Sequence, residues 1–396
     1  MTKLNVLVFL GCLAICSCNE KGKSISNSSK EEAMDSLIKK RYGYLLEYKV
    51  DSTAFPRSYS HEKQQIKGVP SKDWTSGFFA GNLWQLYQLT GNKRFMEKAE
   101  EWTAFIEKEK FNDGTHDMGF KIYCSFGNAL KIKENSVYDS IIIHSAHTLT
   151  TRFNKDIGSI RSWDFNRNVW QFPVIIDNMM NLELLFETTK ITGDSSYYQM
   201  ARTHANTTLK NHFRPDNSCY HVVDYDTITF QPRMKVTHQG IDDESSWARG
   251  QSWAIYGYTM AYRYTKDTTY LKRATATADF FINHEKLPED GIPYWDFEDP
   301  AIPDAPLDVS AGAIAASALV ELYSYTKDST YLDYSHKVLG SLRSDDYILP
   351  DHIEAPFILD HSTGNYPKDD EIDEPIVYAD YYFLETMLRL KKLQSI

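Results

Sequence analysis

Four segments of the sequence share one pattern, and this repeat restricts the chain to a few helical architectures. They begin at Leu89 (LTGNKRFMEKAEEW), Ile191 (ITGDSSYYQMARTH), Tyr264 (YTKDTTYLKRATAT) and Tyr325 (YTKDSTYLDYSHKV). Each has a Thr, then Gly or Lys, then Asn or Asp, and an aromatic residue three positions further on. Because an Asn or Asp side chain suits the N-cap of a helix, each segment predicts two helices joined by a tight turn.

The helices on the two sides of these turns differ in composition. Those before a turn are apolar or small on most faces, as in FFAGNLWQLYQ and AGAIAASALVELYSY, whereas those after it are charged on one face. Apolar helices are expected inside and amphipathic helices outside. The irregular spacing of the turns excludes a short solenoid repeat. The sequence therefore predicts an all-α fold, an (α/α)6 barrel formed by a toroid of six helical hairpins, with long loops on the active-site side.

Short strands are expected near CYHVVDYD and GIPYWDF, where aromatic and β-branched residues gather. No regular alternation of Val/Ile-rich strands with helices is present, which disfavours a Rossmann or other α/β fold.

The N-terminus has the features of an export signal. Lys3 precedes an apolar run over residues 4–15, which is too short to span a membrane. The segment ICSC, which ends at Cys18, is typical of a bacterial lipobox and predicts cleavage before Cys18 and lipidation of its thiol. A plain cleaved signal is the alternative. We expect an exported bacterial lipoprotein, periplasmic or associated with the outer membrane, held to the membrane only by its N-terminal lipid anchor.

The domain organisation follows from this signal. Residues 1–17 are predicted to form the lipoprotein signal peptide, residues 18–35 a polar, flexible tether, and residues 36–396 the catalytic barrel domain. Apart from Cys12, Cys16 and Cys18 of the export segment, the sequence contains Cys124 and Cys219, and it leaves open one disulfide between them or two buried free thiols.

Charge and motif content narrow the function. The formal net charge of −11 argues against a nucleic-acid partner, which requires a basic surface. The sequence has no Gly-rich dinucleotide motif, no P-loop and no zinc-binding HExxH helix. The segment GQSWA ends in Ala and does not match a nucleophile elbow. We expect neither a metal nor a cofactor.

Aromatic and polar side chains are dense in the stretches that lead into the inner helices. Flat rings beside carboxylates and a few cations are typical of a sugar-binding groove, because rings stack on C–H faces while polar groups bond hydroxyls. The candidates for binding are Trp74, Trp163, His221, His238, Gln239, Trp247, Arg249 and Trp253. Taken singly, the rings also suit a core, and Arg249 also suits a salt bridge to Asp242, Asp243 or Glu244.

Two carboxylates are candidates for chemistry. Asp177 lies in FPVIIDNMMNLELLF, where Pro173 suits the first turn of a helix that is apolar on nearly every face. Burying an isolated carboxylate is costly, so Asp177 is expected to have a function. Asp117, between His116 and a Met-Gly-Phe turn, is either functional or a turn residue.

Five separated motifs closely resemble those of unsaturated glucuronyl hydrolases, glycoside hydrolase family 88. They are DWTSGFFAGNLW, HDMGF, IIDNMMNLELL, THQGIDDESSWARGQSW and HSTGN followed by YADYYFLETMLRL, and they run from about Trp74 to Leu390. The resemblance implies an (α/α)6 barrel that removes a 4,5-unsaturated uronic acid from the non-reducing end of oligosaccharides made by polysaccharide lyases. It implies that Asp177 is the general acid/base, that Asp117 assists it, and that the eight binding candidates contact the sugar.

The chemistry implied by the resemblance is hydration of the C4=C5 vinyl ether, after which the hemiketal opens and the glycosidic bond breaks. One group donates a proton to carbon and then takes one from water, so its pKa is expected near neutrality. Burial in an apolar helix supplies that shift, and Asn181 is expected to orient Asp177.

Three points stay open at this level. The segment HSTGNYPKDDEIDE lacks the serine and lysine spacing of family members that favour sulfated substrates, although Ser362, Asn365 and Lys368 are available. A family 105-like unsaturated rhamnogalacturonyl hydrolase is an alternative enzyme. A lipid-anchored oligosaccharide-binding protein without catalysis is the alternative from another class, and the presence of both Asp117 and Asp177 speaks against it.

Overall fold

The computed structural model describes Met1 and residues 27–394, so the predicted signal peptide and the lipidation site Cys18 lie outside the described residues. Within this range the inner helical elements are α2 (Ser76–Thr90), η2 (Gly119–Gly127) with α4 (Asn128–Leu130), η3 (Ile176–Asn181) with α6 (Leu182–Thr192), α8 (Ala248–Thr265), α10 (Val309–Thr326) and α12 (Val377–Gln394). The outer helices are α1 (Asn27–Glu47), α3 (Lys93–Ala104), α5 (Ser136–Thr150), α7 (Ser195–Asn211), α9 (Thr268–Ile282) and α11 (Ser329–Leu342). Helix α1 covers part of the range predicted as a tether.

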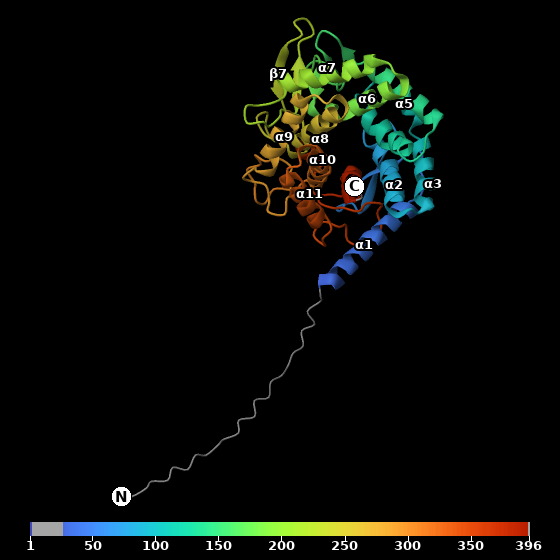
Figure 1. Cartoon of the computed structure of the whole chain (residues 1–396), viewed down its shortest axis with the longest axis vertical. Helices are drawn as coiled ribbons and strands as arrows, with labels where there is room; N and C mark the ends of the chain where they lie inside the picture. The colour runs from blue at the N-terminus through green and yellow to red at the C-terminus, as the bar shows by residue number, and fades with distance from the viewer. Residues whose placement is uncertain (2–26, 395–396) are drawn as a thin grey trace.

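Inner and outer helices alternate along the chain and close into a ring. Figure 1 shows α3, α5, α7, α9 and α11 following the rim in chain order, with α2, α6, α8 and α10 inside them. The first inner helix, α2, packs against the last, α12, so the ring closes between distant parts of the sequence. The predicted (α/α)6 barrel is confirmed.

The four repeated turns have one geometry. The residue that ends each inner helix adopts the left-handed conformation: Gly91 (φ 71°), Gly193 (φ 75°), Lys266 (φ 56°) and Lys327 (φ 61°). The next residue caps the outer helix by accepting a backbone N–H two residues further on: Asn92, Asp194, Asp267 and Asp328. The preceding threonine accepts the N–H of the capping residue. Local capping therefore fixes each hairpin, as the sequence predicts.

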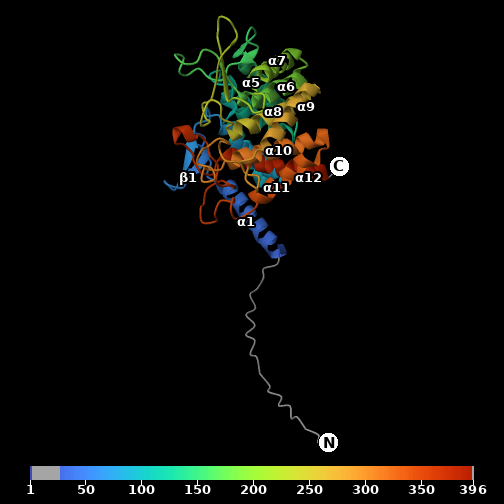
Figure 2. The same ribbon diagram turned by 90° about the vertical axis from the view of Figure 1, so that its left-hand side faces the viewer.

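The short turns lie at the C-terminal ends of the inner helices, so long connections lead to the N-terminal ends of those helices. In Figure 2, β1 and the C-terminus lie on opposite sides of the ring. Every strand of the described residues belongs to the segments that lead into inner helices. These strands are β1 (Phe55–Ser60), β2 (Gln65–Val69), β3 (Phe153–Asn154), β4 (Ser159–Ile160), β5 (Pro173–Ile175), β6 (Val222–Tyr225) and β7 (Pro232–Val236). The long connections thus gather at one end of the barrel.

The three-stranded antiparallel sheet β5–β6–β7 corrects one prediction and confirms another. Pro173 was expected in the first helical turn, but β5 pairs with β6 in the register Val174 to Val223, and the helix begins at Ile176. A short apolar run does not by itself distinguish a strand from a helix, and the β-branched residues here pair as a strand. The strand expected in CYHVVDYD is β6. In GIPYWDF, only isolated bridges form, at Tyr294 and Asp296.

Glycines let the inner helices approach closely. A Cβ at Gly77 would lie 2.3 Å from the carbonyl oxygen of Phe120, and one at Gly119 would lie 2.6 Å from Cα of Asn181. The backbones of α2, η2 and η3 are therefore in close contact at these glycines. Element η2 is a π-helix rather than a regular α-helix. The irregular segment therefore lies where the backbones are closest.

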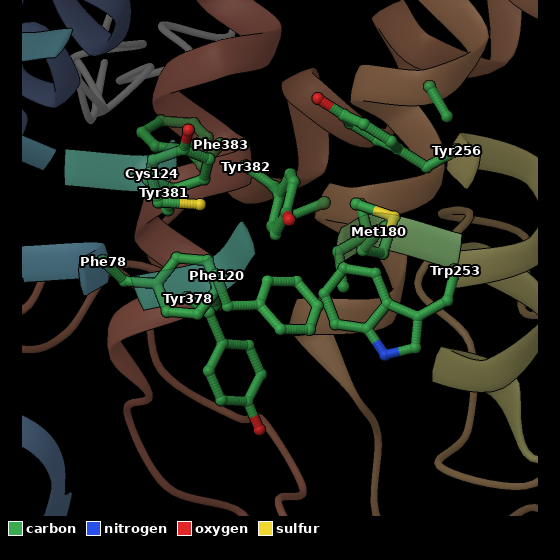
Figure 3. Close-up of a cluster of buried hydrophobic side chains, with 14 of the residues drawn as sticks. Phe78, Phe120, Cys124, Met180, Trp253, Tyr256, Tyr378, Tyr381, Tyr382 and Phe383 are labelled. Carbon is green, nitrogen blue, oxygen red and sulfur yellow. The ribbon is translucent and has the colours of Figure 1, made fainter. Parts of the chain in front are cut away.

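Buried aromatic rings from several inner helices form one cluster (Figure 3). Phe120 lies 5.2 Å from Trp253, and Trp253 lies 5.5 Å from Tyr382, measured between ring centroids. Cys124 and Cys219 are buried free thiols, so the disulfide left open by the sequence does not form. Among the described helices, none combines the length and the apolar character that crossing a membrane requires.

Candidate active site

Asp177 is the second residue of η3, at the start of an inner helix rather than one turn inside it. It is 9% exposed, and burial raises the pKa of its carboxyl to about 7. The positive charge of Arg249 opposes this shift in pKa, and the negative charge of Asp117 adds to it. Within the described residues, Oδ2 of Asp177 has no hydrogen-bond partner. The site thus contains a carboxyl group that is partly protonated at neutral pH.

Asp117 is held on both oxygens. Thr115 Oγ1 donates a hydrogen bond to Oδ2 at 2.6 Å, and His116 Nε2 lies 3.2 Å from Oδ1. His116 is buried, which lowers its pKa and favours the neutral ring. The two carboxylates therefore differ in their surroundings, because Asp117 is oriented by side-chain partners whereas Oδ2 of Asp177 is not. Such asymmetry is how one site assigns different tasks to two carboxylates.

The tautomer of His221 follows from its contacts. The backbone N–H groups of His238 and Gln239 both donate to Nδ1 of His221, each at 3.1 Å. Nδ1 therefore carries a lone pair, and the proton lies on Nε2. Nε2 is 3.8 Å from Oδ2 of Asp177, and burial lowers the pKa of His221 well below its usual value. The ring thus presents a neutral N–H beside the carboxyl group of Asp177.

Arg249, in the first turn of α8, is buried and forms an ion pair with Asp308, the N-cap residue of α10. It also donates to the carbonyl oxygens of Thr363 and Gly364. The salt bridge from Arg249 to Asp242, Asp243 or Glu244 that the sequence allowed does not form, because Arg249 pairs with Asp308 instead. Its guanidinium lies 4.6 Å from the ring centroid of Trp247. Arg249 joins the start of two inner helices to the segment before α12.

We predict that Arg249→Lys lowers both the melting temperature and kcat/KM. Lysine keeps the charge opposite Asp308 but loses the planar fork that also reaches the carbonyls of Thr363 and Gly364. We expect kcat/KM to fall at least about tenfold, or about 1.4 kcal/mol. Thermal unfolding and kinetics measured on the same variant test this, with Arg233→Lys as the control. A change in melting temperature without a change in kcat/KM would remove Arg249 from the site.

Trp74 and Trp253 belong to one cluster of aromatic rings between the inner helices. Trp74 precedes α2 and packs on Tyr378 and Phe120 with centroid distances of 4.9 and 5.3 Å. Phe120 in turn contacts Trp253, which is fully buried in α8. The structure therefore connects Trp74 to Trp253 through Phe120.

The remaining binding candidates lie on loops. Trp163 packs on His238 at 5.4 Å, and His238 lies 6.5 Å from His221, measured between ring centroids. Gln239 donates from Nε2 to the carbonyl oxygen of Gly364 at 3.1 Å. Trp247 packs on His221 at 4.6 Å. The structure thus brings these four candidates together around His221 and the segment before α12.

The sequence did not identify every residue of this arrangement. Asp308 can be recognised from the sequence as a helix-capping residue, but not as the partner of Arg249. Thr115 lies two positions before Asp117, and the sequence does not mark its hydrogen bond to that carboxylate. Asn181, expected to orient Asp177, instead accepts the backbone N–H of Phe120 and joins η2 to η3. In residues 27–394, no cluster of three His, Cys, Asp or Glu side chains could hold a metal ion.

Two carboxylates and packed aromatic rings at the N-terminal ends of the inner helices fit the class of glycoside hydrolases, and comparison with known proteins shows the family. Residues 48–264 match the model of Glycosyl Hydrolase Family 88. The chain is 56% identical to an unsaturated glucuronyl hydrolase of Formosa agariphila, with 99% of both chains covered. The chain belongs to glycoside hydrolase family 88.

Other comparisons agree. An unsaturated chondroitin disaccharide hydrolase of Streptococcus agalactiae is 30% identical and covers 91% of both chains. The crystal structure of an unsaturated glucuronyl hydrolase specific for heparin superposes with a TM-score of 0.88 at 40% identity, covering 94% of this chain and 99% of that one. The chain is therefore an enzyme with the activity of an unsaturated glucuronyl hydrolase, acting on unsaturated uronic acid oligosaccharides. The family 105-like alternative is not favoured.

Proposed function

We propose that Asp177 is the general acid/base in the removal of a 4,5-unsaturated uronic acid from the non-reducing end of a lyase-generated oligosaccharide. The observation that carries this proposal is a buried carboxyl group with a pKa of about 7 beside the N–H of a neutral histidine. A group with this pKa supplies both the acid and the base at neutral pH, which general acid–base catalysis requires.

The reaction runs in two halves. Protonated Asp177 donates its proton to C4 of the uronate, and positive charge develops at C5 and the ring oxygen. Water adds to C5 and gives its proton to the Asp177 carboxylate, which restores the acid. The resulting hemiketal opens, and collapse of the hemiacetal at C1 releases the next sugar. Asp177 therefore ends the cycle as it began, with no net proton transfer.

Neighbouring groups are assigned supporting roles. Asp117, held by Thr115 and His116, supplies a fixed negative charge that stabilises the cation at C5. The Nε2–H of His221 faces Asp177 and is placed to donate to the incoming water or to a sugar oxygen. The partly exposed ring of Trp74 offers apolar surface to the sugar, and the fully buried ring of Trp253 packs behind it through Phe120.

Loss of the ultraviolet absorbance of the conjugated C4=C5 bond tests the activity. The substrates are lyase-derived disaccharides from heparin and chondroitin, each with and without sulfate. They are chosen because one similar protein is named a chondroitin disaccharide hydrolase and another is described as specific for heparin. Turnover of at least one of them is expected. No turnover with any unsaturated disaccharide would contradict the proposed reaction.

We further propose that the protein is a lipoprotein exported to the periplasm or the outer membrane. Support comes from the lipobox-like segment that ends at Cys18 and from the polar stretch that follows it. Cys18→Ala is expected to release the protein from the membrane fraction, because the lipid chain is the proposed anchor. Fractionation of cells that express each form checks this, with Cys12→Ala as the control. Membrane association of Cys18→Ala equal to that of wild type would exclude the anchor.

A further inference from the structure

Phe165 is a large apolar side chain that the proposed mechanism does not use. It lies in the connection between β4 and β5 and is 45% exposed. Its ring stacks on Trp163 at a centroid distance of 5.0 Å and an interplanar angle of 12°. The ring of His238 lies 5.8 Å away, also measured between centroids. Phe165 is therefore held in place by two residues next to the site while part of it faces solvent.

Exposure rises along a path that leads outward from the catalytic carboxyl group. Asp177 and His221 are buried, His238 is partly exposed, and Phe165 is exposed. Successive rings on this path lie 6.5 Å apart from His221 to His238 and 5.8 Å apart from His238 to Phe165. The path therefore leads from a buried carboxyl group to a solvent-exposed aromatic ring.

The reaction fixes the direction of the substrate on this path. The terminal uronate must reach Asp177, so the sugars on its reducing side extend toward solvent. On this path Trp163 and His238 lie next to His221, and Phe165 lies further out toward solvent. A pyranose presents an apolar C–H face, which stacks on an exposed aromatic ring.

We propose that Phe165 is a specificity-determining residue. It stacks on a sugar that lies beyond the first sugar on the reducing side of the cleaved bond. The enzyme would then favour oligosaccharides longer than disaccharides. This inference rests on the proposed function, because it takes the position of the terminal uronate from Asp177.

The test compares Phe165→Ala with wild type on an unsaturated disaccharide and on the unsaturated tetrasaccharide of the same polysaccharide. Because only the tetrasaccharide reaches Phe165, its kcat/KM is expected to fall about threefold to tenfold more than that of the disaccharide when the ring is removed. Phe165→Tyr, which keeps the ring, is expected to restore the preference. Equal losses on the two substrates, or no loss on either, would overturn the proposal.

Phe111→Ala is the matched control. Phe111 is 66% exposed, and its ring contacts are to His144 and Lys110, outside the site. Its replacement is expected to leave the ratio of the two kcat/KM values at the wild-type level. If wild type turns over neither substrate, the proposed function fails. If wild type turns over both and the ratio is the same in Phe165→Ala, only the role of Phe165 fails.

Discussion

Asp177→Asn is expected to lower kcat by roughly 10²- to 10⁴-fold while the fold is retained, the range typical of general acid–base groups. The amide is nearly isosteric with the carboxyl group but neither donates a proton to C4 nor accepts one from water. Steady-state kinetics on an unsaturated disaccharide measures the loss. A variant that keeps more than about a tenth of the wild-type kcat would contradict the assignment of Asp177.

The pH dependence of wild type provides a second measurement on the same group. The pKa of Asp177 is about 7 in the folded protein and 3.8 in its ordinary state, so the folded state holds the proton more tightly. The stabilisation from this proton is therefore fully present below the ordinary pKa and is lost as pH rises through about 7. Activity should decline over the same range, because the first step needs the protonated acid. Asp177→Asn should lose less stability than wild type over this range.

Asp117→Asn is expected to cause the second largest loss, roughly 10²-fold or more in kcat, because it removes a negative charge near Asp177 that we propose stabilises the cation at C5. Thr115 Oγ1 and His116 Nε2 hold the carboxylate in wild type, and the amide keeps the shape but not the charge. The measurement is kcat together with the melting temperature. A near-normal kcat with a lowered melting temperature would reduce Asp117 to a turn residue.

Thr115→Val separates orientation from charge at the same position. The variant removes the 2.6 Å hydrogen bond to the Asp117 carboxylate and the acceptor of the Asp117 backbone N–H, but it leaves the carboxylate in place. An intermediate loss of kcat, smaller than that of Asp117→Asn and recovered by Thr115→Ser, would show that orientation contributes. An unchanged kcat would show that His116 suffices to hold Asp117.

The features that could be predicted from the sequence are those that depend on neighbouring residues. Each turn is fixed by three consecutive residues: a threonine, a residue in the left-handed conformation and a capping Asn or Asp. The four turns could therefore be recognised in the sequence as a repeat. Asp177 was recognisable because a carboxylate in an apolar run is unusual, and the structure shows that it is buried.

The features that could not be predicted depend on contacts between distant residues. Arg249 pairs with Asp308 rather than with a nearby acid, because the ring brings the starts of α8 and α10 together. The strand at Pro173 depends on its pairing with β6, about fifty positions along the chain. Asn181 joins η2 to η3 because Gly119 lets the two backbones touch.

The bonds from Arg249 to Thr363 and Gly364 have a consequence for biosynthesis. Both carboxylates are present once the first half of the chain has left the ribosome, but the carbonyls that hold Arg249 come from one of the last segments to be made. Helix α12, which closes the ring against α2, follows that segment. A nascent or C-terminally truncated chain therefore carries both proposed catalytic carboxylates without the carbonyl groups and the helix that complete the site around Arg249. Hydrolytic competence should therefore be acquired in a late step of folding, after the C-terminal segment has joined the barrel.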